Sequence, residues 1–434
     1  MDYTAEIISA KADPQRLEEL YRAAERAQQA ELFRTSMLAC FEQSPDNLLY
    51  AAWYHRLAPE GRQVPAEDAA GANWKLAIPL SLAAGLLLWL LSGPAAVFPK
   101  GDPVLLALWA PLEAGFVLAY LAGSARRPLS AYLPALLGLV GLTAVALAFI
   151  SPRDSQYSLL MYIHLPLVAW SAIGLSLTGW SSGHSNRFAF LAKSLEVFGT
   201  AAIFGGAVGL FVLITSGLFQ ALGIQLPEPV QRLLILGAGG AIPVLAVASA
   251  YDPRLDPLQQ RVESGLGRLI PTVMWLLLPL SLVVGAIYLV AIPFNFLGPF
   301  RSRELLFVYN AMLFAVLALL VGATPVHEED LPARYGKWLR TGILALAAMA
   351  VVVSLYALSA TVYRTLQGAL TPNRLTVIGW NIINIAILVV MLYRLARRRT
   401  EAWSEAVHSA IGQGTVAYIF WTALLVLGLP VLFS

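Results

Sequence analysis

The chain has 434 residues, of which 58% are hydrophobic and only 13% are charged, and its net charge is +3. Ordinary soluble domains contain about 45–50% apolar and about 25% charged residues, so this composition excludes a typical soluble fold. The arginines lie at the ends of apolar segments rather than in one patch, which excludes nucleic acid as a partner. The composition is that of a protein whose surroundings are a lipid bilayer.

Residues 1–58 are polar and predict a small cytoplasmic hairpin of two helices. Asp13-Pro14 supplies an N-cap and a first-turn proline, and apolar residues then recur at helical spacing. Ser44-Pro45-Asp46 ends this pattern, and a second helix is expected at 48–57. A hairpin of this size buries too little to be stable alone. We therefore expect it either to present a docking surface to a partner protein or to pack as a structural cap on cytoplasmic loops.

Residues 59–73 predict a linker, and residues 74–434 predict an all-α polytopic bundle of about eleven transmembrane helices. A span needs about 20 apolar residues. Runs of this length occur at 74–92, 104–123, 130–150, 159–178, 196–216, 231–250, 269–292, 305–323, 339–362, 375–393 and 412–433. Interior prolines predict kinks in several runs. Glycines cluster in the fifth and sixth runs and predict close helix packing, or alternatively broken helices that expose backbone at mid-membrane: Gly205, Gly206, Gly209, Gly237, Gly239 and Gly240.

The positions of Lys and Arg predict the orientation. The first apolar run begins at Trp74, too late for a cleavable signal peptide, so the N-terminus is expected to stay in the cytoplasm. With the N-terminus inside, the cytoplasmic loops hold about twice as many Lys and Arg residues as the external loops, which favours an N-in, C-out arrangement. The strongest cytoplasmic anchor is a cluster of four arginines: Arg394, Arg397, Arg398 and Arg399.

Polar residues inside the apolar runs carry most of the functional information. A charged group at mid-bilayer costs about 2.5–3.5 kcal/mol on insertion scales, so it usually faces a cavity or a partner. Glu113 lies near the centre of the second run, beside Pro111. It is interpreted as a proton-linked carboxylate or a cation ligand. The alternative is a carboxyl group kept neutral by burial and hydrogen-bonded to a neighbouring helix.

Four further polar residues fall at similar depths in three other runs: His164, Asn310, Asn381 and Asn384. The spacing of three places Asn381 and Asn384 on one helix face. Together the four side chains predict a polar vestibule that opens to the outside. The alternative is that each forms an interhelical hydrogen bond, worth only about 0.6 kcal/mol on average.

The external loop before the tenth run predicts an anion-binding mouth. Thr371-Pro372 gives an N-cap and a first-turn proline, so a helix N-terminus lies beside Arg364 and Arg374. A helix N-terminus with two arginines suits a phosphate or a carboxylate. Alternatively, the two arginines meet lipid phosphates.

The same loop carries a family resemblance. Arg364, followed by Gly368-Ala369-Leu370-Thr371-Pro372-Asn373-Arg374, resembles the signature of a domain-of-unknown-function family of bacterial multi-pass inner-membrane proteins. That family has a Tyr-Gly-Leu-Thr-like turn after a similar arginine, whereas Ala369 here separates Gly368 from Leu370. The resemblance covers the fifth run to Arg399. It implies a bacterial cytoplasmic membrane and a multi-pass architecture, and no activity.

The sequence has no His-Glu-x-x-His and no phosphate-binding loop. Cys40 is the single cysteine, so no disulfide and no cysteine metal cluster is expected. Only His164 lies inside a span, which leaves no haem-ligand pair. The run His327-Glu328-Glu329-Asp330 is interpreted as a solvated loop. We expect no catalytic residue, no metal and no cofactor.

Two classes of function are consistent with these patterns. The first, which we favour, is a permease-like protein that binds or moves a small polar or anionic solute. Its path would use Glu113 and the four residues of the polar vestibule, with Arg364 and Arg374 at the mouth. The second is a non-transporting scaffold or sensor that presents the N-terminal helices to a partner protein. A weaker alternative is a membrane-embedded transferase acting on a lipid head group.

Overall fold

The structure is a computed structural model. It describes residues 3–26, 29–44, 47–57, 72–98, 101–125, 127–150, 155–260, 266–301, 303–327, 333–397 and 403–433. These residues are helical, with turns and loops between the helices, and the one β-type contact among them is an isolated bridge between Val97 and Pro103. Contacts divide the chain into two compact units, Met1–Gly71 and Ala72–Ser434.

The first unit contains four helices where the sequence predicted two. They are α1 (Thr4–Ser9), α2 (Pro14–Arg26), α3 (Ala30–Gln43) and α4 (Leu48–Leu57). The carboxylate of Asp13 accepts a hydrogen bond from the backbone N–H of Arg16 at 3.1 Å, as expected of an N-cap to α2. The break between α2 and α3 was missed because apolar residues continue at helical spacing across it. The helical backbone is nevertheless interrupted there: Gln29 is not helical and precedes the first residue of α3.

The extra helices give this unit a core of its own. Phe33 is fully buried, and its ring lies 5.7 Å from the ring of Tyr3, 5.6 Å from that of Tyr21 and 5.9 Å from that of Trp53. The contacts join residues from α2, α3 and α4 to the segment that precedes α1. Most of the predicted linker, residues 59–73, lies outside the described residues, as do Pro45 and Asp46.

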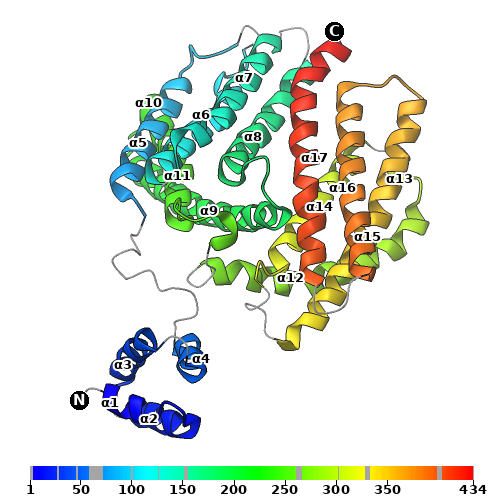
Figure 1. Ribbon diagram of the computed structural model, residues 1–434. Coiled ribbons are helices and arrows are strands. Elements are labelled where there is room, and N and C mark those ends of the chain that lie inside the picture. The colour runs from blue at the N-terminus through cyan, green and yellow to red at the C-terminus, as the bar shows by residue number, and fades with distance from the viewer. Residues whose placement is uncertain are drawn as a thin grey trace. The chain divides into compact units, whose positions relative to one another are not determined.

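The second unit begins at Ala72 and contains all of the long apolar helices (Figure 1). Its helices are α5 (Trp74–Leu91), α6 (Leu105–Ser124), α7 (Leu133–Phe149), α8 (Ser155–Thr178), α9 (His184–Ala221), α10 (Glu228–Arg232), α11 (Ala238–Ala250), α12 (Leu266–Ala291), α13 (Gly298–Arg301), α14 (Arg303–Ala323), α15 (Ala333–Leu366), α16 (Pro372–Arg397) and α17 (Trp403–Leu432). A π-helical turn, η2 (Leu233–Gly237), joins α10 to α11.

Every one of the eleven predicted runs is helical, and among the described residues nine helices are long and apolar enough to cross a membrane. The nine are Trp74–Leu91, Leu105–Ser124, Gln156–Thr178, His184–Ala221, Glu228–Ala250, Leu269–Asn295, Tyr335–Leu366, Pro372–Arg397 and Trp403–Leu432. The predicted runs 130–150 and 305–323 contain the shorter apolar helices Leu133–Phe149 and Val308–Ala323.

Glycines allow a close contact between α5 and the segment formed by η2 and α11. A Cβ added to Gly85 would lie 2.1 Å from the carbonyl oxygen of Gly237, and one added to Gly240 would lie 3.0 Å from the Cα of Gly85. The close packing predicted for the sixth run is therefore confirmed at Gly237 and Gly240. The prediction is wrong at Gly206, Gly209 and Gly239, where an added Cβ would meet nothing within 4 Å. At Gly205 an added Cβ would lie 3.9 Å from Cδ1 of Ile242, an ordinary contact.

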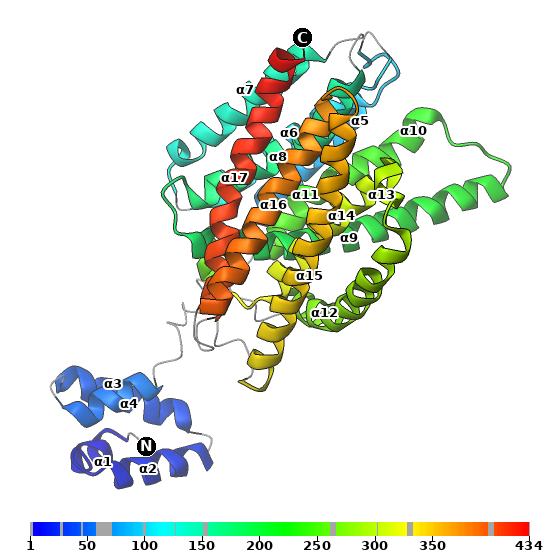
Figure 2. The same ribbon diagram turned by 90° about the vertical axis from the view of Figure 1, so that its right-hand side faces the viewer.

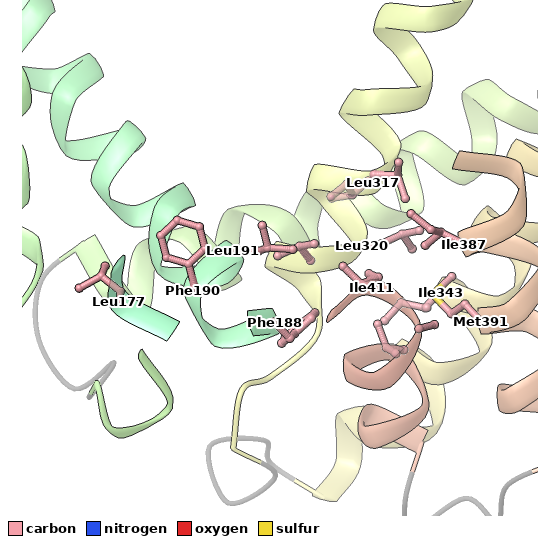
Figure 3. Close-up of a cluster of buried hydrophobic side chains, with 14 of the residues drawn as sticks. Leu177, Phe188, Phe190, Leu191, Leu317, Leu320, Ile343, Ile387, Met391 and Ile411 are labelled. Carbon is pink, nitrogen blue, oxygen red and sulfur yellow. The ribbon is translucent and has the colours of Figure 1, made fainter. Parts of the chain in front are cut away.

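The main core lies where the start of α9 meets α14, α15, α16 and α17. Figure 3 shows Phe188 and Leu191 of α9 on one side of this core and Leu320, Ile387 and Ile411 on the other. Helices α15, α16 and α17 lie side by side in both views (Figures 1 and 2). In contrast, only 6% of the residues in the most apolar 18-residue window of α9, and likewise of α12, are buried. The second half of α9 extends away from α15–α17 (Figure 2). The unit therefore presents a large apolar flank.

Candidate functional site

A cavity of about 490 Å³ lies between α6, α8, α9 and α11. Six residues of α6 line it, and four of them are spaced four apart and share one helix face: Trp109, Glu113, Val117 and Leu121. At 1.5 Å per residue this stripe runs for about 18 Å. Prolines, aliphatic residues and aromatic rings make up most of the remaining wall. Its polar members are Glu113, Lys193, Ser194 and Tyr251.

Glu113 is the unusual member of this wall. Its side chain is 5% exposed, and neither carboxyl oxygen has a hydrogen-bond partner among the described residues. Both oxygens are buried, so the side chain borders the cavity through its carbon atoms. The carboxyl tip lies beside Gly240, where an added Cβ would come within 3.2 Å of Oε1. Leaving a buried polar group without a hydrogen bond costs about 1–3 kcal/mol, and more for a charged group.

An ion pair lies on the α9 side of the same cavity. The Nζ of Lys193 is 2.7 Å from Oε2 of Glu196, and the two side chains are only 10% and 13% exposed. Lys193 lines the cavity, and the pairing neutralises its charge. The sequence interpretation missed this pair because it placed Lys193 in a loop before a run that starts at residue 196. Since α9 begins at His184, both residues are one turn apart on a helix. Their opposite charges at a spacing of three were the available signal.

His164 points away from this cavity, toward α16. The indole N–H of Trp380 donates to Nε2 of His164 at 3.1 Å. An indole N–H only donates, so Nε2 must be an acceptor, and the proton of the neutral ring lies on Nδ1. Nδ1 then donates to the carbonyl oxygen of Leu160 at 2.7 Å. Both ring nitrogens of His164 are therefore engaged within the bundle.

The three asparagines gather near Trp380. The amide nitrogen of Asn381 donates to Oδ1 of Asn310 and to the carbonyl oxygen of Val377, both at 2.9 Å. Oδ1 of Asn384 accepts a hydrogen bond from the hydroxyl of Tyr418 at 2.6 Å, and the ring of Tyr418 lies 5.5 Å from that of Trp380. The four predicted vestibule residues thus come together across α8, α14, α16 and α17. They do so as interhelical contacts, and none of them lines the Glu113 cavity.

The two arginines of the α15–α16 loop do not line the Glu113 cavity either. The guanidinium of Arg374 folds back onto its own loop, where Nη1 donates to the carbonyl oxygen of Ala369 at 2.6 Å. Its backbone N–H donates to Oγ1 of Thr371 at 3.3 Å, which supports the predicted N-cap of α16. Arg364, in the last turn of α15, has its Nη1 buried without a hydrogen-bond partner among the described residues.

The site residues predicted from the sequence therefore separate into three places: a cavity with Glu113, a hydrogen-bonded cluster around Trp380, and the α15–α16 loop. Across the described ranges no three His, Cys, Asp or Glu side chains come together as a metal site. His327 contacts the carbonyl oxygen of Leu258 at 2.9 Å, while residues 328–330 lie outside the described part of the chain.

No protein family, curated protein or solved structure matches the chain in the comparisons made. The resemblance carried by Arg364 and the segment 368–374 therefore stays a prediction.

Proposed function

We propose that the protein is a permease-like, multi-pass membrane protein that binds a small solute in the Glu113 cavity. The observation that carries this proposal is a buried carboxyl group without a hydrogen bond on the wall of a cavity of about 490 Å³. The cavity volume is within the range of about 300–1,000 Å³ typical of small-molecule sites. The proposal includes that all eleven runs cross a bacterial cytoplasmic membrane, with the N-terminus inside and the C-terminus outside.

The chemistry of the wall favours a solute with a positive charge or a strong hydrogen-bond donor. The expectation of an anionic solute rested on Arg364 and Arg374, and the guanidinium of Arg374 is engaged by its own loop. On the cavity wall, the charge of Lys193 is balanced by Glu196, which leaves the carboxyl of Glu113 as the unpaired group. A carboxyl group in an apolar setting either stays neutral or pairs with a cation. A cationic solute supplies that partner.

Glu113 can meet a solute by rotation of its own side chain. The carbon atoms of the side chain border the cavity, and its carboxyl group has no hydrogen bond to break. Glutamate torsions move between staggered wells, so a different rotamer brings the carboxyl group into the cavity. Gly240 leaves room for the carboxyl in its inward-facing position. The proposal therefore gives the side chain two positions: the observed one beside Gly240 and a second one against the solute.

The cluster around Trp380 has a supporting role in this proposal. Helix α8 carries His164 on the side that bonds to α16, and Pro166 and Trp170 on the side that lines the cavity. The hydrogen bond between Trp380 and His164 holds α8 against α16, and the other hydrogen bonds of the cluster join α16 to α14 and α17. They thereby fix the position of one cavity wall.

Transport of tetramethylammonium by the full chain in liposomes tests the proposal. We expect counterflow of the labelled cation with the wild-type protein. Removing one partner of a buried charge pair costs about 2–5 kcal/mol, so Glu113→Gln should weaken half-saturation about 30-fold or more. Glu228→Gln is the matched control, because Glu228 lies outside the cavity with an exposed side chain that pairs with Arg232. Equal counterflow by wild type and Glu113→Gln would exclude Glu113 as the binding group.

A second candidate, a scaffold that presents the N-terminal unit, is favoured by one observation. The four helices α1–α4 bury their own core of aromatic and aliphatic side chains, including Phe33, Met37 and Trp53. Deletion of residues 1–58 distinguishes the two candidates. A permease should keep tetramethylammonium counterflow after the deletion, whereas a scaffold should lose its cellular phenotype through this deletion and keep it in Glu113→Gln.

A further inference from the structure

We infer that the Glu113 cavity takes a lipophilic organic cation, an onium ion with bulky apolar groups, which enters sideways from the bilayer. This inference rests on the proposed function and specifies the class of solute and its route.

Several aromatic side chains line the cavity. Five of the lining residues are aromatic: Trp109, Trp170, Phe190, Phe198 and Tyr251. The ring of Phe190 is stacked on that of Trp170, with centroids 5.8 Å apart, and the ring of Phe198 lies 6.2 Å from Trp170. The faces of such rings attract a cation, and most strongly where water is excluded. Aromatic faces beside one carboxyl group are a recognised arrangement for binding organic ammonium ions.

Trp170 is held so that its ring, rather than its N–H group, is offered to the cavity. The indole N–H donates to Oγ of Ser194 at 3.1 Å, and that hydroxyl donates to the carbonyl oxygen of Phe190 at 2.8 Å. Phe190 packs over Gly174, where an added Cβ would lie 2.7 Å from the Phe190 ring. The aromatic wall is therefore fixed before any solute arrives, which lowers the cost of ordering it on binding.

The balance of charge on the wall selects a cation over an anion. Lys193 is the positive group in the cavity, and Glu196 pairs with it at 2.7 Å. Glu113 has no such partner. When its carboxyl group is ionised, the three side chains together carry one negative charge. A bound anion would have to compete with Glu196 for Lys193, whereas a cation meets Glu113 without displacing anything.

The cavity opens onto the apolar flank of the bundle rather than onto a polar surface. Trp109 of α6 and Phe198 of α9 both line the cavity, yet their side chains are 42% and 54% exposed. They lie within two helices long and apolar enough to cross a membrane. Large apolar side chains exposed on a membrane span face lipid. These two residues therefore mark a rim through which a solute dissolved in the bilayer reaches Glu113.

Equilibrium binding of tetraphenylphosphonium to the full chain in lipid nanodiscs tests this inference, with empty nanodiscs as the blank. Tetraphenylborate has the same shape and the opposite charge. We expect saturable binding of tetraphenylphosphonium, no saturable binding of tetraphenylborate, and a loss of affinity of about 30-fold or more in Glu113→Gln. Saturable binding of both ions, or binding that is unchanged in Glu113→Gln, overturns the inference.

Tetramethylammonium in the same assay separates this inference from the proposed function. It carries the positive charge without the bulky apolar groups. If it binds in a Glu113-dependent way while tetraphenylphosphonium does not, the lipophilic solute and the sideways route are wrong and the proposed function stands. If neither cation binds, both proposals fall.

Two phenylalanines of α9 provide a matched pair for the rim. Phe198 lines the cavity and is 54% exposed. Phe211, which lies further along the same helix, is 59% exposed and does not line the cavity. Loss of one cation–π contact weakens binding by about 2-fold at an exposed site and about 30-fold at a desolvated one. We expect Phe198→Ala to lower tetraphenylphosphonium affinity within that range and Phe211→Ala to leave it unchanged. Equal effects of the two substitutions contradict the placement of the rim.

Discussion

Trp380 and His164 form a donor–acceptor pair between α16 and α8, with 3.1 Å between the indole nitrogen and Nε2 of the imidazole. Since Nδ1 of the same ring is engaged by the carbonyl oxygen of Leu160, the histidine is committed to helix packing on both sides. A histidine in this state has no free nitrogen to offer a solute. The pair therefore belongs to the framework that holds the cavity rather than to the cavity itself.

Trp380→Phe should destabilise the protein. The substitution keeps an aromatic ring and removes the donor, so Nε2 of His164 is left buried without a partner at a cost of about 1–3 kcal/mol. Trp421→Phe is the control, because the indole nitrogen of Trp421 is buried without a hydrogen bond in the described structure. Unfolding in a denaturing detergent compares the two variants. A larger loss of stability in Trp421→Phe would contradict the assignment.

Gly240→Ala should disturb both the α5–α11 contact and the position of Glu113. The new methyl group would lie 2.9 Å from Cδ1 of Leu88, 3.0 Å from the Cα of Gly85 and 3.2 Å from Oε1 of Glu113. Overpacking of this kind costs about 1–3 kcal/mol. Gly239→Ala, one residue earlier, meets nothing within 4 Å and should be neutral or slightly stabilising. Thermal unfolding of the two variants checks this contrast, which fails if they behave alike.

Lys193 and Glu196 should show strong coupling in a double-mutant cycle. Removing one partner of a fully buried ion pair costs about 3–5 kcal/mol. The Lys193–Glu196 pair is part-buried, so Lys193→Met alone should destabilise the protein by a smaller amount. Replacing both residues, as in Lys193→Met with Glu196→Gln, should restore much of that loss. The yield of folded protein and its unfolding curve measure the effect. Additive losses in the double variant would show that the two side chains do not act as a pair.

The N-terminal unit should lose stability under acid conditions through Glu18. Hydrogen bonds from Arg56 and then Arg22 hold the pKa of Glu18 below its usual value. A lowered pKa in the folded state means that the stabilisation is fully present above the pKa of the unfolded chain. It is lost as the pH falls through the lower, folded pKa. The protection of α1–α4 against hydrogen exchange, measured in the full chain relative to the intrinsic exchange rate at each pH, should therefore fall below about pH 4. The loss of protection should be smaller in Glu18→Gln, and an equal loss in both proteins would count against this contact.

The helical content could be predicted from the sequence because the signal is local. Each apolar run of about 20 residues became a helix, and the prediction needed no knowledge of neighbours. The same locality explains the misses. The break at Gln29 interrupts an otherwise regular pattern, and the start of α9 at His184 lies well before the first apolar window, so Lys193 was placed in a loop.

The candidate site could be predicted only in part, because the hydrogen-bond partner of a side chain depends on the tertiary structure. Burial of Glu113 followed from its place in an apolar run, whereas its lack of a hydrogen bond depends on which side chains of α5, α9 and α11 surround it. The convergence of Asn310, Asn381 and His164 on one region was predicted from their similar depths. That they satisfy one another or Trp380, rather than face water, depends on side-chain directions that residue spacing does not specify.

Helix α9 has 38 residues, which at 1.5 Å per residue is about 57 Å, while the hydrocarbon layer of a bilayer is about 30 Å thick. A membrane helix of that length has to tilt strongly or extend one end into the head-group region. Its tilt depends on the thickness of the surrounding bilayer. One side of the cavity is formed by residues of α9, including Phe190, Lys193 and Phe198. A change in the tilt of α9 should therefore shift these three side chains relative to the cavity residues of α6 and α8.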